Sequence, residues 1–214
     1  MQGEQLNQTE VTERGLLGDR AYALRDNFDG KIATAKNPRK WPNLFDYSAV
    51  LLGGPAVGEE LPAARITFPD GTTLATDHAQ TSRMLSAALK RHVTLEAIER
   101  SESSRASNKE TSEEYWLDME GLEYRDTVTD FNLPEGTFFD TAVVHILTKA
   151  TLDRLHELYP EGRFEVPRFR PNIVVSPTDG SKGFIAQHNQ VNVGVYASVV
   201  RAGRIRVGHT VRLE

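Results

Sequence analysis

The sequence has 214 residues and no cysteine, with 25 Lys and Arg against 30 Asp and Glu, a formal net charge of −5. This length can bury the core of one large domain or two small ones, and the absence of cysteine excludes disulfides and thiolate metal sites from this chain alone. There is no long apolar run and the first residues do not resemble a signal peptide, so we expect a cytoplasmic protein without a membrane partner.

The charge is unevenly distributed along the chain. Residues 96–140 contain 13 Asp and Glu against 4 Lys and Arg, whereas residues 163–214 contain 8 Lys and Arg against 3 Asp and Glu. An acidic middle segment would repel phosphates, so we expect no nucleic-acid partner. The basic C-terminal segment suits a small anionic ligand; the alternative is that the two segments attract each other or are merely solvated.

Short strands and turns dominate the first half. Residues 18–26 alternate, 27–30 (NFDG) have turn chemistry and 31–36 return, which predicts a β-hairpin. Residues 64–76 predict a second hairpin around Pro69-Asp70-Gly71. The first clear helix is expected within 78–93, where an apolar stripe is formed by Met84, Leu85, Ala88 and Leu89.

A polar segment, residues 99–114, contains no apolar residue larger than alanine. Such a composition is typical of an exposed loop or linker. We therefore expect one domain over residues 1–98 and a second over residues 115–214.

In the second half, the apolar run 142–147 (AVVHIL) predicts a buried strand. Thr148 is expected to be the N-cap of a helix whose apolar side is formed by Leu152, Leu155 and Leu158. Residues 163–177 alternate in the manner of a strand, with Arg168, Arg170 and Asn172 on one face. Residues 193–214 predict two closing strands around Ala202-Gly203, with a further turn near Gly208-His209.

The junction at Thr148 is a candidate anion site. A helix that begins directly after a strand offers free N–H groups and the positive end of its dipole, to which Lys149 adds a charge. Arginine forks at 168 and 170 suit phosphate or carboxylate, and would converge on this site if their strand packed beside the first. The alternative is that the junction is purely structural and the arginines form ion pairs or are solvated. Arg20 starts the strand that follows the Gly18-Asp19 turn. The structural explanation of this pattern is that Asp19 caps the turn and Arg20 is exposed to solvent.

The order of five motifs resembles the MOSC family, named for the C-terminal domain of molybdenum-cofactor sulfurase. The similarity is to members with an N-terminal MOSC barrel before the MOSC domain proper, such as the mitochondrial amidoxime-reducing component. The motifs are GLLGDRAYAL (15–24), GKIATAKNPRKWPNL (30–44), GTFFDTAVVHILTKATLDRL (136–155), RFRPNIVV (168–175) and VGVYASVVRAGRIRVGHTVRL (193–213).

This resemblance implies a mostly β fold with a few helices (α+β), in which a MOSC-type β-barrel follows a smaller barrel-like N-terminal part. It implies the molybdenum cofactor (Mo-molybdopterin) as ligand, with Arg170 directed at its phosphate end. The cofactor-binding residues carried over by position are Arg20, Thr148, Lys149, Arg170, Asn172 and Tyr196.

The sequence departs from the family pattern in one place. Where related proteins carry a cysteine-bearing segment, residues 174–184 run almost directly into 185–196. Either the natural protein has this segment in addition to the 214 residues, or the chain is a shortened homologue that has lost the metal ligand. We therefore assign no catalytic residue and no metal ligand.

Two functions are consistent with these patterns. One is a molybdenum-cofactor oxidoreductase for N-hydroxylated or related small-molecule substrates, supplied with electrons by a separate protein, or a sulfur-transfer protein. The other is a cofactor- or anion-binding module without turnover, which needs Arg20, Thr148 and Arg170 but no cysteine.

Overall fold

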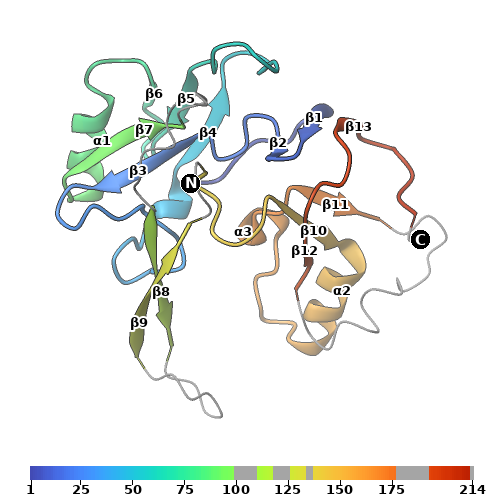
Figure 1. Cartoon of the computed structure of the whole chain (residues 1–214). Helices are drawn as coiled ribbons and strands as arrows, with labels where there is room; N and C mark the ends of the chain where they lie inside the picture. Colours follow the sequence, from blue (N-terminus) through green and yellow to red (C-terminus); the bar gives the residue numbers. More distant parts are fainter. Residues whose placement is uncertain (99–109, 118–125, 134–136, 177–192, 213–214) are drawn as a thin grey trace. The chain divides into compact units, whose positions relative to one another are not determined.

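The structure is a computed structural model that describes residues 1–98, 110–117, 126–133, 137–176 and 193–212. These residues form mainly short strands with a few helices, which confirms the expected mostly β class (Figure 1). The chain divides into two compact units. Unit 1 comprises Met1 and Gly18–Thr141, and unit 2 comprises Gln2–Leu17 and Ala142–Glu214.

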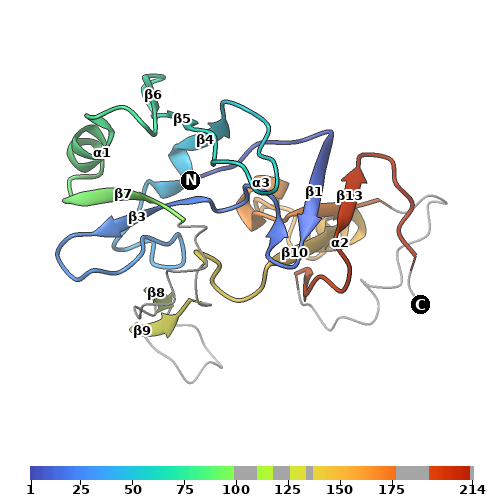
Figure 2. The same cartoon turned by 45° about the horizontal axis from the view of Figure 1, so that its top comes forward.

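This division differs from the expected boundary at residues 99–114. Strand β1 (Gln8–Thr12) pairs with β2 (Gly15–Leu16) on one side and with β13 (Gly203–Arg206) on the other, so both ends of the chain belong to one sheet (Figure 2). Pairing between such distant segments leaves no local pattern in the sequence. Of the polar segment, residues 99–109 lie outside the described residues.

The remainder of that segment enters a strand rather than a linker. β8 (Thr111–Trp116) pairs antiparallel with β9 (Thr127–Asn132) in unit 1. The polar residues of β8 are tolerated because they meet polar partners. Ser112 is buried and its hydroxyl donates to the carbonyl of Ile32 at 2.8 Å, while Glu113 forms an ion pair with Lys31.

The second expected hairpin is confirmed in unit 1. β5 (Ala64–Thr67) pairs antiparallel with β6 (Thr73–Ala75) and, on its other side, with β4 (Ser48–Leu51). The turn between β5 and β6 is fixed by two local features. The carboxylate of Asp70 accepts from the amide of Thr72 at 2.9 Å, and Gly71 adopts a φ of +84°, which glycine tolerates without strain.

The first expected hairpin is only partly right. β3 (Tyr22–Asp26) pairs over its whole length with β7 (Val93–Ala97), and Ile32 makes only isolated bridges, to Arg25 and Ser112. The pairing with β7 brings Leu24 and Val93 into the same core, so tertiary packing overrides the local turn preference.

Helix α1 (Thr81–Leu89) lies alongside β7 and has the predicted apolar stripe (Figure 1). Leu85 is fully buried, and Met84 and Leu89 pack against the core. The 3-10 helix η1 (Leu44–Asp46) contributes Leu44. The buried core of unit 1 consists of Leu24, Trp41, Leu44, Tyr47, Ile66, Phe68, Leu85 and Val93.

Unit 2 is built around strand β10 (Val144–Thr148). β11 (Ile173–Val175) pairs parallel with it on one side and β12 (Val195–Ala197) antiparallel on the other. Helix α2 (Lys149–Leu158) begins directly after β10 and forms part of the crossover that a parallel neighbour requires. Thr148 is confirmed as its N-cap, and Leu147 and Leu152 are buried.

The arginine-rich segment is not a strand, contrary to expectation. Residues Val166–Phe169 form the short helix α3, with Pro167 in its first turn, a position where proline is favoured. Arg170 has a φ of 50°, the left-handed conformation that ends a helix, and β11 begins only at Ile173. Arg168, Arg170 and Asn172 therefore do not share a strand face.

The closing strands also differ from a simple hairpin, because β12 pairs with β10 and β13 with β1. Sheets among the described residues have two or three strands each, and none of them closes into a barrel. Within that same part of the chain, no helix is both long and apolar enough to cross a bilayer.

Candidate functional site

The start of α2 has the features expected of an anion site, but its hydroxyl is already engaged. The Thr148 side chain is buried and accepts a hydrogen bond from the amide of Thr151 at 3.1 Å. It also shares a hydrogen bond with the Thr151 hydroxyl at 2.9 Å. Lys149, the first residue of the helix, is exposed. The group available to an incoming anion is therefore the Lys149 ammonium beside the positive end of the helix.

Asn172 serves the backbone of unit 2. The backbone amide of Asn172 donates to the backbone carbonyl of His145 at 2.8 Å. The side-chain oxygen of Asn172 accepts from the backbone amide of His145, also at 2.8 Å. The side chain thus continues the β10–β11 ladder by one step before β11 begins. The amide oxygen expected to contact a cofactor is consequently occupied by the sheet itself.

Tyr196 lies on the other side of the same histidine. The two residues are paired across β10 and β12, and their rings lie 5.2 Å apart between centroids. Tyr196 is 57% exposed. Gly194 allows this approach, because a Cβ there would lie 2.3 Å from Nε2 of His145.

The register of β10 separates these groups from Thr148. Asn172 and Tyr196 flank His145, whereas Thr148 pairs with Val175 at the other end of the strand. Three residues of a strand span about 10 Å, and residues of odd separation project from opposite faces. The side chains of Tyr196 and Thr148 therefore lie on opposite faces of the sheet, and Arg170 precedes Asn172 at the far end from Thr148.

Arg20 lies in unit 1, in a turn before β3 and not at the start of a strand, with a φ of 47°. Its guanidinium forms a 2.8 Å ion pair with Asp140 and lies 5.2 Å from the ring centroid of Phe139. Lys36 reaches the other oxygen of Asp140 at 3.3 Å. Burial by itself would raise the pKa of Asp140, but the charges of Arg20 and Lys36 outweigh it and lower that pKa to about 2.

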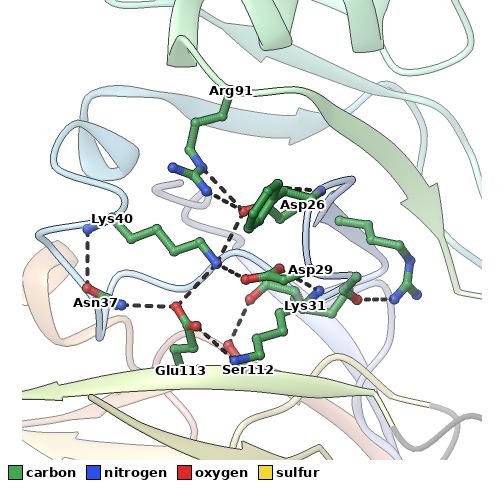
Figure 3. A network of polar contacts seen from close by, with 12 residues as sticks. Asp26, Asp29, Lys31, Asn37, Lys40, Arg91, Ser112 and Glu113 are labelled. Carbon is green, nitrogen blue, oxygen red and sulfur yellow. Dashed lines mark hydrogen bonds and ion pairs between the residues drawn. The ribbon is translucent and has the colours of Figure 1, made fainter. Parts of the chain in front are cut away.

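Unit 1 also contains a dense network of ion pairs, drawn in Figure 3. The Lys40 ammonium lies 3.2 Å from Asp26, 2.5 Å from Asp29 and 3.2 Å from Glu113. Arg91 donates to Asp26, whose side chain is only 1% exposed. Burial opposes the charge of Asp26, but hydrogen bonds from Arg91, the Phe28 amide and Lys40 keep its pKa below the usual value. All these groups satisfy one another, so the network stabilises the fold.

The six predicted residues thus occupy separate places. Thr148 and Lys149 adjoin at the start of α2, and Asn172 and Tyr196 flank His145, with Arg170 two residues before Asn172. Arg20 belongs to the other unit. Within unit 2 the structure does not gather them into one cluster, because the arginine-rich segment joins the sheet at the opposite end of β10. The place where residues 174–184 run into 185–196, at which related proteins carry the cysteine-bearing segment, lies largely in residues 177–192, which are outside the described residues.

The residues present can be tested against the molybdenum cofactor implied by the resemblance. The start of α2 fits the phosphate end of molybdopterin, since a helix N-terminus with an adjacent lysine is a phosphate-binding arrangement. The described residues do not offer a set of ligands for the molybdenum ion. Among the residues that the structure describes, no three His, Asp or Glu are placed to hold an ion, and the sequence has no cysteine.

Comparison of the chain with protein-family models, with curated proteins and with solved structures finds no match.

Sequence reasoning overlooked His145, which links both flanking strands. The available signal was its position as the only polar residue within the apolar run 142–147. It also overlooked the basic run Lys90-Arg91-His92 after α1, where three consecutive ionisable side chains follow the end of a helix.

Proposed function

We propose that this chain is a MOSC-type module that binds molybdopterin through its phosphate end and supplies no protein ligand to molybdenum. The observation that carries this proposal is the direct passage of β10 into α2 at Thr148, with Lys149 exposed at the first helical position. The order of the five sequence motifs supports it independently. The MOSC-type barrel arrangement of the two parts belongs to the same proposal.

The roles of the chain's own residues follow from their chemistry. Lys149 holds the phosphate by charge beside the positive end of α2, and Thr148, whose side chain accepts from the Thr151 amide, keeps the first turn in place as the cap. Arg20, Arg170, Asn172 and Tyr196 enter the proposal through the resemblance only. When bound, the cofactor would supply redox chemistry at its metal.

The test uses the whole chain purified from cells that make molybdopterin. Bound pterin is released by acid, oxidised and measured by fluorescence, and molybdenum is measured by metal analysis. We expect pterin to copurify, and Lys149→Gln to reduce the affinity about tenfold or more, as expected for a charged hydrogen bond. Arg154→Gln, the same charge change at an exposed site on α2, should leave the pterin content within about twofold.

Two outcomes would change the conclusion. A protein that neither copurifies with pterin nor takes it up would overturn the binding function. Reduction of an N-hydroxylated substrate by the pterin-loaded chain would instead favour the oxidoreductase function, because a binding module alone would not turn over a substrate.

The free energy of unfolding of each variant shows whether a loss of pterin binding comes from a lost contact or from a damaged fold. Thr148→Ser keeps a capping hydroxyl, whereas Thr148→Ala removes it and should lower the free energy of unfolding by about 1 kcal/mol. If Lys149→Gln lowered stability as much as Thr148→Ala, its effect on pterin would have to be assigned to the fold.

A further inference from the structure

A second place with binding chemistry lies entirely within unit 1. An open cavity of about 660 Å³ is bordered by one side of α1, from Ser82 to Ala87, by the residues that lead from α1 into the start of β7, and by Asn27. Cavities that hold small molecules in proteins commonly have this volume. Its location does not overlap the start of α2, which belongs to unit 2.

The charge of its lining has one sign. The ionisable residues that border it are Arg83, Lys90, Arg91 and His92, and no carboxylate is among them. Arg83 donates to the side-chain oxygen of Gln80 and forms no ion pair within the described part of the chain. Lys90 is exposed and likewise has no acidic partner there. These two cations are therefore available to a ligand.

Arg91 is held in place by the network of unit 1 (Figure 3). Its Nε and Nη2 donate to one oxygen of Asp26 at 3.2 and 2.8 Å, and its guanidinium lies 5.3 Å from the ring centroid of Trp41. Lys40 provides Asp26 with a second cation, at 3.2 Å. Asp26 therefore has two cationic partners, and Arg91, which also borders the cavity, is already ordered by Asp26 without a ligand.

Polar groups in the walls of the cavity are paired by hydrogen bonds. The Ser86 hydroxyl accepts from the Val93 amide at 2.9 Å and donates to the Ser82 carbonyl at 2.7 Å. The Ser82 hydroxyl accepts from the Leu95 amide at 3.0 Å. At the end of α1 the amides of Lys90 and Arg91 donate to the carbonyls of Ala87 and Ser86, which satisfies carbonyls that would otherwise repel an anion.

We propose that this cavity binds a small phosphate-bearing molecule. Arg91 is a fixed positive charge at the border of the cavity, while Lys90 and Arg83 supply flexible cations that close around the phosphoryl oxygens. A compact dianion matches the several positive charges better than a single carboxylate does. The proposal does not depend on molybdopterin binding, because its residues lie in the other unit.

The competing explanation is that these cations only complement the negative end of the α1 dipole and need no ligand. Lys90 distinguishes the two explanations. It has a φ of 54°, the left-handed conformation in which glycine is favoured at a helix end. Lys90→Gly therefore removes the ammonium without loss of the fold.

The experiment titrates the whole chain with pyrophosphate by calorimetry at low and at physiological ionic strength. We expect saturable binding of one pyrophosphate in the cavity, weakened about tenfold by Lys90→Gly. Arg65→Gln, the same charge change at an exposed site on β5, and Lys149→Gln should each change the affinity for the cavity less than twofold.

Absence of saturable binding by the unmodified chain would overturn the proposal. Equal weakening by Lys90→Gly and Arg65→Gln would also overturn it, because it would show attraction to overall charge. If Lys149→Gln alone abolished the binding, pyrophosphate would be located at α2 and the cavity would be assigned no ligand. Retention of wild-type thermal stability by Lys90→Gly confirms that the measured loss is one of contact.

Discussion

Asn172 and His145 are joined by two hydrogen bonds of 2.8 Å, one from the Asn172 amide to the His145 carbonyl and one from the His145 amide to the Asn172 side-chain oxygen. The side chain thereby replaces a backbone carbonyl at the point where β11 has not yet begun. The asparagine of the Arg-Pro-Asn sequence, which by its resemblance suggests ligand binding, thus stabilises the sheet by bonding to β10.

Asn172→Ala should lower the free energy of unfolding by about 1–2 kcal/mol, because the part-buried amide of His145 loses its acceptor. Urea denaturation of the variant and the parent chain measures this difference. Gln8→Ala on the exposed start of β1 is the control, and should change stability by less than about 0.5 kcal/mol. An Asn172→Ala variant as stable as the parent would show that this side-chain hydrogen bond does not stabilise the sheet.

Gly194→Ala should be more damaging than its small size suggests. Its φ is +85°, and a Cβ would lie 2.8 Å from the carbonyl oxygen of Ile146, which cannot move without disturbing β10. We expect a loss of about 2 kcal/mol or more, measured by thermal unfolding.

Gly203→Ala is the matched control for Gly194→Ala, because nothing lies within 4 Å of its added Cβ. It should be close to neutral. Similar losses in both variants would point to a general intolerance of unit 2 and not to the contact with Ile146.

Asp26→Asn should destabilise unit 1 by about 2–4 kcal/mol, because it leaves Arg91 and Lys40 without a common buried counter-charge. Asp77→Asn, an exposed site before α1, should have almost no effect. Chemical denaturation followed by tryptophan fluorescence is suitable, since Trp41 lies against Arg91 and Lys40. Equal stability of the two variants would contradict a stabilising role for the network.

The Asp140 ion pair predicts a specific dependence on pH. Its folded pKa of about 2 lies below the ordinary value of 3.8, so folding stabilises the ionised form. The contribution is fully present above the unfolded pKa and is lost as the pH falls through about 4 to about 2. Such a shift corresponds to at most about 2.5 kcal/mol.

The difference in unfolding free energy between the parent chain and Asp140→Asn measures this contribution. It should be largest at neutral pH and shrink toward zero as the pH approaches 2. Asp77→Asn provides the baseline. A difference that stays constant over this range would show that Asp140 acts through packing rather than through its charge.

Local patterns in the sequence were reliable where neighbouring residues decide the structure. The Pro69-Asp70-Gly71 turn joins β5 and β6 as predicted, α1 has the expected apolar stripe, and Thr148 caps α2. Each of these features depends on hydrogen bonds or side-chain spacing within a few residues, which composition and periodicity can register.

The arginine-rich segment shows how such a pattern can mislead. Alternation from Arg168 to Val175 suited a strand, yet Pro167 begins a short helix and Arg170 ends it in the left-handed conformation. The alternation of polar and apolar residues did not register these backbone angles. As a result, Asn172 joins β10 at the end opposite to Thr148, with Arg170 two residues before it, and the expected single cluster does not form.

By itself the sequence determined the mostly β class, the turns at residues 27–30 and 69–71, the two longer helices and the presence of a helix start with lysine beside it. Only the tertiary structure decided that β3 pairs with β7, that β1 pairs with β13, and that Arg83, Lys90 and Arg91 border one cavity. The physical reason is that these arrangements join segments far apart in the chain. Burial of Leu24 with Val93 and neutralisation of Asp26 by Arg91 select among pairings that local preferences leave equivalent.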